Sequence, residues 1–194
     1  MKFAILFLFL IPVMVALLWF LLPKFFEQPN YSVIKKSGSF EIRIYPKMLV
    51  ANINIEGQRD EALRKSFPSL SKYISGKQRG GPKISMTVPV MQTNAGSNNY
   101  WSVYFFIPSK YTFESVPKPQ IDGIEILELS RKKMAVVMFR GLWKESTMKF
   151  HEDKLKNWIK SEGLLPKENI IYAFYNDPST PGVLRRNEIL IELN

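Results

Sequence analysis

The chain has 194 residues, 46% of them hydrophobic and 23% charged, which excludes a disordered protein and allows one domain with a sizeable core. It contains no cysteine, which excludes disulfides, cysteine-ligated zinc, a thiol nucleophile and lipid attachment through cysteine. The net charge is +10, of which residues 1–30 contribute only +1. The basic remainder favours anionic partners such as a carboxylate-bearing ligand, anionic lipid headgroups or nucleic acid.

The first segment is apolar. Residues Phe3 to Leu22 are uncharged and are interrupted only by Pro12. A helix of that length spans roughly 30 Å, the thickness of the hydrocarbon core of a bilayer. A cleaved signal peptide is the alternative, but its apolar region is usually about 7–15 residues long and ends in small residues. Here Ala16 is followed by large residues, so we predict one uncleaved transmembrane helix, with the anchor and its linker covering residues 1–30.

Basic residues flank the predicted span on both sides. Lys2 precedes it, and Lys24, Lys35 and Lys36 follow it, so the positive-inside signal is nearly balanced. We expect a cytoplasmic N-terminus and an external or periplasmic domain over residues 31–194. The linker Pro23–Asn30 is short, so this domain is expected to lie close to the bilayer.

The first half of the domain is predicted to contain five strands and a helix. Alternation of apolar and polar residues indicates the strands, and Gly57 ends the third of them. Pro68 falls inside the helical pattern, so we expect a kink or a helix that restarts there. The predicted strands are Tyr31–Lys36, Phe40–Tyr45, Met48–Glu56, Ile84–Thr93 and Tyr100–Ile107, and the apolar stripe of the helix is Leu63, Phe67, Leu70 and Ile74.

The same order of elements then recurs. Gly141 follows Gly57 by 84 residues, and Leu155 follows Leu70 by 85, so the spacing of the two halves is nearly constant. We predict an α+β fold in which duplicated strand–helix–strand–strand units form a distorted antiparallel β-barrel flanked by two helices. The elements of the second half are strands at Ile124–Ser130, Met134–Phe139, Ile170–Tyr175 and Glu188–Leu193, and a helix with Met148, Leu155, Trp158 and Ile159 on one face.

Four short motifs occur in order along this domain, and each falls on a predicted element or at its end. They are the opening Tyr31 with Glu41-Ile42-Arg43, the helix start Asp60-Glu61-Ala62-Leu63-Arg64, the strand Lys83-Ile84-Ser85-Met86-Thr87-Val88-Pro89-Val90, and Arg185-Arg186-Asn187-Glu188. Together they resemble the SOUL haem-binding family from Tyr31 nearly to the last residue. The resemblance implies a non-covalent haem or porphyrin-binding module. The fold is also similar to the effector-binding domains of drug-responsive bacterial regulators, which bind varied apolar ligands.

The first helix carries the candidate ligand site. On a helical wheel, Arg64, Phe67 and Ser71 lie on one flank of the apolar stripe, with Lys72 further round. A flat macrocycle with two propionates requires an apolar wall and cations at its rim, which Phe67, Arg64 and Lys72 offer. In the family, positions matching Arg64, Phe67 and Lys72 are implicated in haem contact. The alternative is a solvated basic helix edge with Phe67 in the core.

Other candidate positions are weaker. The proline-rich loop Asp177–Leu184 is a possible lid, or else a stiff connection. His151, the only histidine, is a weak candidate axial ligand of iron. Met86 and Met91 fit core positions better than iron ligation. Arg185 and Arg186 fit an ion pair with Glu188 better than a phosphate site.

No sequence pattern indicates catalysis. The chain lacks the nucleophile-elbow, zinc-protease, P-loop and dinucleotide fingerprints. Aromatic residues around Tyr100–Phe106 alternate with aliphatic ones, which favours a packed strand over nucleic-acid stacking. The expected function is therefore a membrane-anchored tetrapyrrole-binding protein, acting in storage, transfer or buffering, and not an enzyme. The alternatives are a binding module for other amphipathic ligands, such as lipophilic cations or lipids, and an interaction protein that uses its basic face on anionic lipids.

Overall fold

The computed structural model describes residues 14, 25–77, 81–96 and 99–194. The predicted span at residues 3–22 lies outside them, apart from Met14. Within the described part of the chain, no helix is both long enough and apolar enough to cross a membrane.

Strands and helices follow each other in the predicted order, with the same doubled pattern. In chain order the elements are β1 (Ser32–Ser37), β2 (Phe40–Tyr45), β3 (Met48–Glu56), α2 (Arg59–Ser75), β4 (Val90–Asn94), β5 (Tyr100–Phe106), β6 (Ile124–Leu129), β7 (Lys132–Arg140), α3 (Glu145–Ser161), β8 (Pro166–Phe174), the short 3-10 helix η2 (Gly182–Leu184) and β9 (Arg186–Leu193).

All nine strands of the described chain belong to one antiparallel sheet. Its order is β1-β2-β7-β9-β8-β4-β5-β3-β6. The two units β3-α2-β4-β5 and β7-α3-β8-β9 are thus arranged symmetrically about the central β4–β8 pair. Gly57 and Gly141, which end β3 and β7, have nearly equal φ angles of 137° and 141°, a region that favours glycine. The predicted duplication is confirmed.

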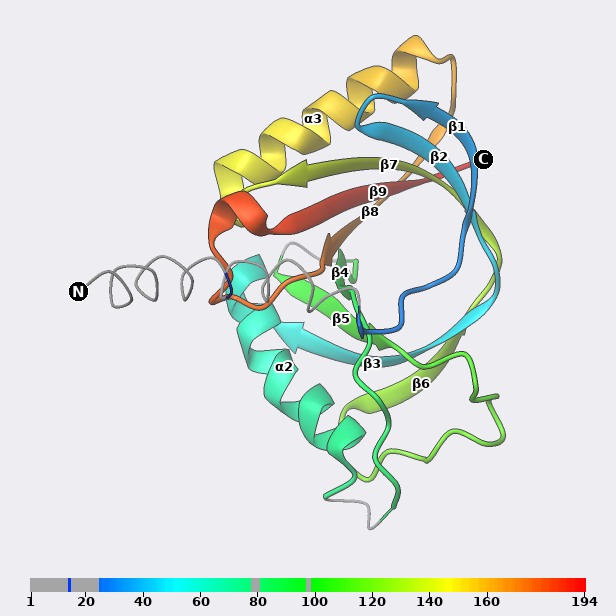
Figure 1. Cartoon of the computed structure of the whole chain (residues 1–194), viewed down its shortest axis with the longest axis vertical. Helices are drawn as coiled ribbons and strands as arrows, with labels where there is room; N and C mark the ends of the chain where they lie inside the picture. Colours follow the sequence, from blue (N-terminus) through cyan, green and yellow to red (C-terminus); the bar gives the residue numbers. More distant parts are fainter. Residues whose placement is uncertain (1–13, 15–24, 78–80, 97–98) are drawn as a thin grey trace, which may run out of the picture.

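The two helices lie on one face of this curved sheet (Figure 1). α2 packs on β3 and β5, and α3 packs on β7 and β9. Alternate strand residues point to opposite faces, so each helix covers a separate apolar cluster, one centred on Leu70 and Phe105 and one on Leu155 and Ile189. A third cluster, which includes Val50, Tyr104 and Leu190, fills the inner face that the helices leave free.

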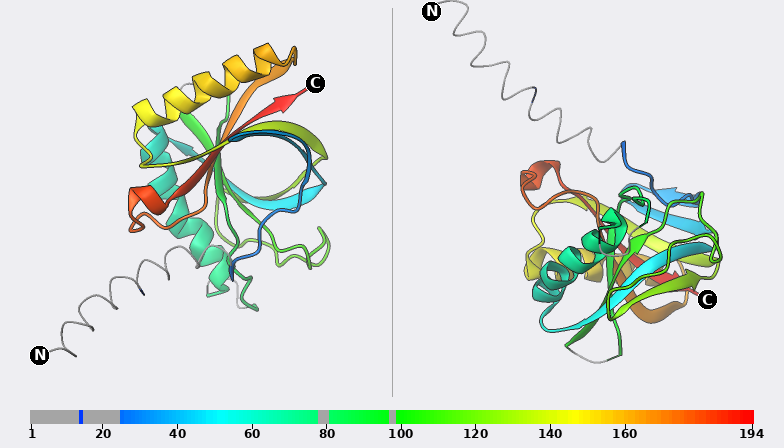
Figure 2. Two further views of the ribbon diagram at one scale, coloured as in Figure 1. Left: turned by 45° about the horizontal axis from the view of Figure 1, so that its top comes forward. Right: turned by 90° about the horizontal axis from the view of Figure 1, so that it is seen from below.

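The sheet is not the closed barrel that the sequence led us to expect. β1 and β6 are its two edges, and they do not pair with each other. Every residue of β1 is exposed, including Val33 and Ile34, and Lys35 and Lys36 add charge to this open edge. The segment after the predicted anchor crosses the open side instead, and Glu27 forms an isolated parallel bridge with Thr87 (Figures 1 and 2).

Two local expectations also differ from the structure. α2 continues through Pro68 without restarting, because Pro68 is exposed while Leu70, Tyr73 and Ile74 after it are buried. The predicted strand Ile84–Thr93 begins only at Val90. Upstream of it, the Ile84 amide donates to the Ile74 carbonyl at 2.8 Å and the Val88 amide to the Glu27 carbonyl at 3.0 Å, so these backbone groups are satisfied without a strand partner.

Candidate functional site

The four residues predicted on the first helix lie along the flank of α2. Arg64, Phe67 and Lys72 are exposed, and Ser71 is half-buried. The Phe67 side chain retains 43% of its exposure, and its ring edge packs on Phe105, with the centroids 5.5 Å apart and an angle of 60° between the planes. Phe67 is therefore an aromatic side chain that is anchored on the core by one edge and open to a ligand on the remainder.

Two exposed cations accompany Phe67 on α2: Arg64 three residues before it and Lys72 five residues after it. The Arg64 Nε atom donates to the Asp60 carbonyl at 3.4 Å, and neither Arg64 nor Lys72 forms an ion pair with another described residue. Lys65 on the same helix differs, because its Nζ atom lies 2.8 Å from the Glu61 carboxylate. The charges of Arg64 and Lys72 are thus available to an external anion. We name Arg64, Phe67, Ser71 and Lys72 the α2 flank.

The α2 flank lines neither of two cavities in the described chain. The larger of these, of about 380 Å³, is lined by the linker, the turn between β2 and β3, the start of β3 and the segment after β5. The smaller, of about 40 Å³, lies on the inner face and is nearly all apolar, with Met48, Met91 and Met134 among its lining residues. A ligand on the α2 flank would therefore rest on an open surface.

The loop Asp177–Leu184 is held by its own hydrogen bonds. The Thr180 amide donates to the Asp177 carbonyl at 2.9 Å, and Arg185 Nε donates to the Thr180 carbonyl at 2.6 Å. The Arg185 guanidinium lies 4.7 Å from the ring centroid of Trp143, which precedes α3. These contacts attach the loop to the start of α3 and stiffen it, and Thr180 is buried.

His151 lies on α3, in the second repeat and away from the α2 flank. Its ring stacks on Phe139 with the centroids 3.8 Å apart and the planes at 10°. Burial, and then the positive charge of Lys154, lower the pKa of His151. The Nδ1 atom is buried and has no partner among the described residues. His151 is therefore a histidine at the edge of α3 whose ring packs on the core.

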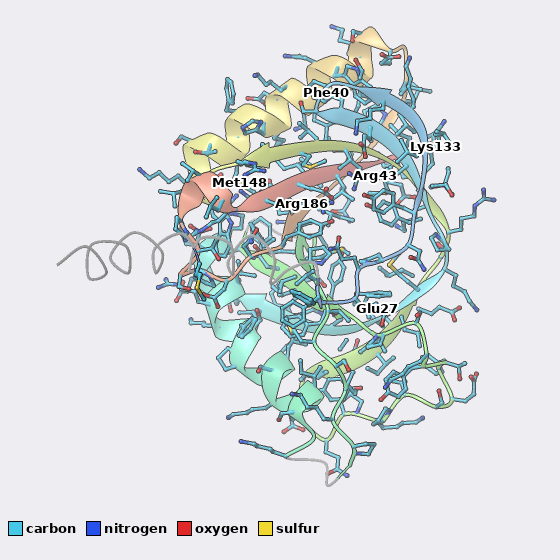
Figure 3. All side chains as sticks on the ribbon, in the orientation of Figure 1. Glu27, Phe40, Arg43, Lys133, Met148 and Arg186 are labelled. Atoms are coloured by element: carbon cyan, nitrogen blue, oxygen red, sulfur yellow. The ribbon has the colours of Figure 1, made fainter. Side chains whose placement is uncertain are left out.

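The motif Arg185-Arg186-Asn187-Glu188 forms part of a buried ion-pair cluster on the inner face of the sheet (Figure 3). Glu188 accepts hydrogen bonds from Arg43 Nη1 at 2.8 Å, from Arg186 Nη2 at 2.7 Å and from the Tyr175 hydroxyl at 2.9 Å. Arg43 Nε also donates to Glu41 at 2.7 Å. The expected ion pair of Arg186 with Glu188 is confirmed.

Sequence reasoning missed Arg43 as a member of this cluster. It assigned Glu41-Ile42-Arg43 to a strand and to a family motif, and alternation placed Glu41 and Arg43 on one face of that strand. Glu188 is 145 residues further along the chain than Arg43. The two charges come together only because β2 and β9 both pair with β7, one on each side of it. Two charged residues on the inner face of one predicted strand were the available signal, since buried charges require partners.

Comparisons with known proteins identify the family of this chain. The family model described as SOUL heme-binding protein matches residues 26–192. Heme-binding protein 2 of Homo sapiens is 30% identical over 167 residues, covering 81% of this chain and 80% of its own length. Heme-binding protein 1 of Mus musculus is 27% identical over 161 residues, covering 80% of this chain and 84% of its own.

A solved structure shows the same fold at much lower sequence identity. The C-terminal domain of EcmrR superposes with a TM-score of 0.63 at 11% identity, covering 84% of this chain and 98% of that domain. This likeness concerns the fold alone. Since the family model spans nearly all of the described domain, the chain belongs to the SOUL heme-binding protein family.

Proposed function

We propose that this chain is a membrane-anchored protein that binds haem or another porphyrin without covalent attachment, for storage, transfer or buffering. The observation that carries the proposal is the α2 flank, where the half-exposed ring of Phe67 shares one helix with two cations, Arg64 and Lys72, that form no ion pair in the described chain. Membership of a family described as heme-binding supports the same ligand class.

The residues of the α2 flank fit the chemistry of a porphyrin. Phe67 offers an aromatic surface on which the macrocycle can pack. Arg64 can bind one propionate in bidentate geometry, and Lys72 can contribute a point charge to the other. Ser71 lies on the same flank and offers a hydroxyl. Bound haem would bring an iron centre to this surface, and the four residues would orient the ring without ligating the metal.

The proposed anchor is residues 3–22, with the domain on the external side of the membrane. The length and apolarity of the segment support a span, and Trp19 and Lys24 near its end are typical of a membrane interface. Glu27 of the linker, which is bound to the domain through the Val88 amide, follows the segment closely, and this supports a domain held near the lipid surface.

A haemin titration of the chain from Phe25 to Asn194, followed at the Soret band, tests the ligand. We expect saturable one-to-one binding, and comparable binding of protoporphyrin IX because ring and propionates are recognised instead of iron. The double variant Arg64→Ala/Lys72→Ala should bind about tenfold more weakly, which corresponds to about 1.4 kcal/mol. Lys154→Ala/Lys160→Ala removes the same charge from α3 and should leave the affinity unchanged.

Non-saturable binding, or equal losses in the two double variants, would contradict the haem assignment. The second candidate is then another amphipathic ligand, such as a lipophilic cation or a lipid. One observation favours it: the cavity of about 380 Å³ has both aromatic and polar lining residues, among them Tyr111, Phe113 and Lys47. Binding of a cationic dye that haemin does not displace would identify this case.

A further inference from the structure

The segment that follows the predicted anchor is fixed to the domain at Glu27. Its carbonyl accepts from the Val88 amide at 3.0 Å, and its carboxylate accepts from the Ser109 amide at 2.7 Å. Glu27 and Thr87 also form a parallel bridge. Leu22, the last residue of the predicted span, is five residues earlier, and five extended residues reach at most roughly 17 Å. The surface around Glu27 therefore has to lie near the bilayer if the span is inserted.

Aromatic side chains are exposed on this surface. Phe25 and Phe113 retain 79% and 47% of their exposure, and Phe26 is also exposed. Phe113 belongs to the same short segment as Ser109, whose amide binds Glu27, and it lines the larger cavity together with Pro29 of the linker. Figure 3 labels Glu27, which belongs to the linker that leads into β1.

The same segment carries a cation. Lys110 is exposed, and its ammonium group lies 5.1 Å from the ring centroid of Tyr111. Aromatic residues next to lysine are typical of protein surfaces at the headgroup level of a bilayer. There the ring is half-solvated and the ammonium group binds lipid phosphate. On a water-facing surface, by contrast, exposed phenylalanines of this kind would be a liability for association.

We propose that this face, defined as Phe25, Phe26, Lys110, Tyr111 and Phe113, rests in the headgroup region of an anionic bilayer. The inference rests on the membrane anchor proposed above and adds an orientation to it. The contacts of Glu27 fix which side of the domain meets the lipid. The cavity bordered by Pro29 and Phe113 then lies at the membrane surface, within reach of amphipathic molecules in the outer part of the leaflet.

The absence of cysteine makes a labelling test direct, since each introduced cysteine is the only one. The full chain, with a single bimane-labelled cysteine, is placed in nanodiscs of phosphatidylcholine and phosphatidylglycerol that contain one lipid with a nitroxide near its headgroup and another with a nitroxide near the end of its acyl chain. Phe113→Cys probes the face, and Met14→Cys probes the anchor. Tyr100→Cys is the matched control, an aromatic residue with 39% exposure at the other end of β5. It is about 20 Å from Phe106, whose carbonyl binds Thr87.

We expect loss of fluorescence at positions 14 and 113 and none at position 100. Quenching at 14 without quenching at 113 would overturn the proposed face while leaving the anchor in place. Equal quenching at 113 and 100 would overturn it as well, because the domain would have no fixed orientation. No quenching at 14 would contradict the anchor itself, and this inference with it.

Discussion

Arg43 has no exposed surface, yet it carries a full positive charge. Burial favours the neutral form, but the hydrogen bond and charge of Glu188 outweigh it, so the pKa of Arg43 is raised. Glu41 shows the complementary effect: burial raises the pKa of its carboxyl, and hydrogen bonds from Lys36 and Arg43 lower it by more. The charges of Arg43, Glu41 and Glu188 are therefore stabilised by their ion-pair partners, since these three side chains have almost no contact with water.

Removal of the central cation should strongly destabilise the fold. Arg43→Met leaves the buried carboxylates of Glu41 and Glu188 without their shared donor, and we expect the free energy of unfolding to fall by about 3–5 kcal/mol in urea titrations. Lys35→Met is the control, because it breaks only the exposed pair of Lys35 with Glu162 and should change stability by less than about 1 kcal/mol. Similar losses in both variants would show that the inner cluster contributes no more than a surface pair.

His151 should make stability depend on pH. Its pKa in the fold lies below the ordinary value of 6.5, so the unfolded chain takes up a proton before the folded chain does. The contribution of the neutral ring is present above about pH 6.5 and is lost as the pH falls toward the folded pKa. In His151→Phe, which retains an aromatic ring against Phe139, the drop in unfolding free energy between about pH 7.5 and about pH 5.5 should be smaller than in the wild type. An unchanged drop would assign the dependence to other groups.

At the scale of elements, α2 contains a helix-breaking residue that its packing overrides. Pro68 has no amide hydrogen to donate to the Arg64 carbonyl, and the buried residues on either side hold the helix together. We expect Pro68→Ala to raise the free energy of unfolding by about 1–3 kcal/mol, measured by urea denaturation. Ser69→Ala, at the next position, should change it by less than about 0.5 kcal/mol. A destabilised Pro68→Ala variant would mean that the ring itself contributes contacts.

The elements show what the sequence could predict. Alternation located β2, β3 and β5 within a residue of their observed ends, and the stripe with Leu70 and Ile74 identified the buried side of α2. The segment before Val90 also reads as a strand, but its backbone partners are the end of α2 and the linker, which only the folded chain brings near. The prediction of a closed barrel was wrong for a related reason. The strand pattern contains no information on whether the edge strands β1 and β6 pair with each other.

For the candidate site, too, the sequence predicted positions along the helix but not contacts between elements. Helical periodicity placed Arg64, Phe67 and Ser71 on one flank of the helix, and the structure has them there. The i,i+4 spacing allows both a Glu61–Lys65 pair and an Asp60–Arg64 pair. Spacing could not show that only the first forms, while Arg64 donates to the Asp60 carbonyl and not to its carboxylate. Nor could it predict how Phe67 packs, since Phe105 is on a strand of the sheet beneath.

At the scale of the whole molecule, an open sheet leaves strand edges that natural proteins protect with charge. β1 is exposed throughout and carries Lys35 and Lys36 beside Val33 and Ile34. We expect Lys35→Val/Lys36→Val to self-associate with increasing concentration, as measured by light scattering. Lys154→Val/Lys160→Val makes the same change on α3, where no strand edge is available, and should remain at the mass of the wild type. Equal association of both variants would point to net charge instead of the edge.

The turns at Pro46–Lys47 and Ser130–Arg131 are the two places where the chain passes between the halves of the sheet. Tyr45 is paired with Lys132 on one side of them, and Met48 with Leu129 on the other, so both crossings occur at the same point in space. Residues 48–129 are thus one continuous module whose ends meet, joined to the rest through the β4–β8 ladder. Recombination between relatives at these two turns can exchange the module, and the α2 flank within it, without cutting a strand. Such an exchange would replace Val88 and Ser109, the partners of Glu27, together with the α2 flank, so the attachment of the linker and the flank would be inherited as one unit.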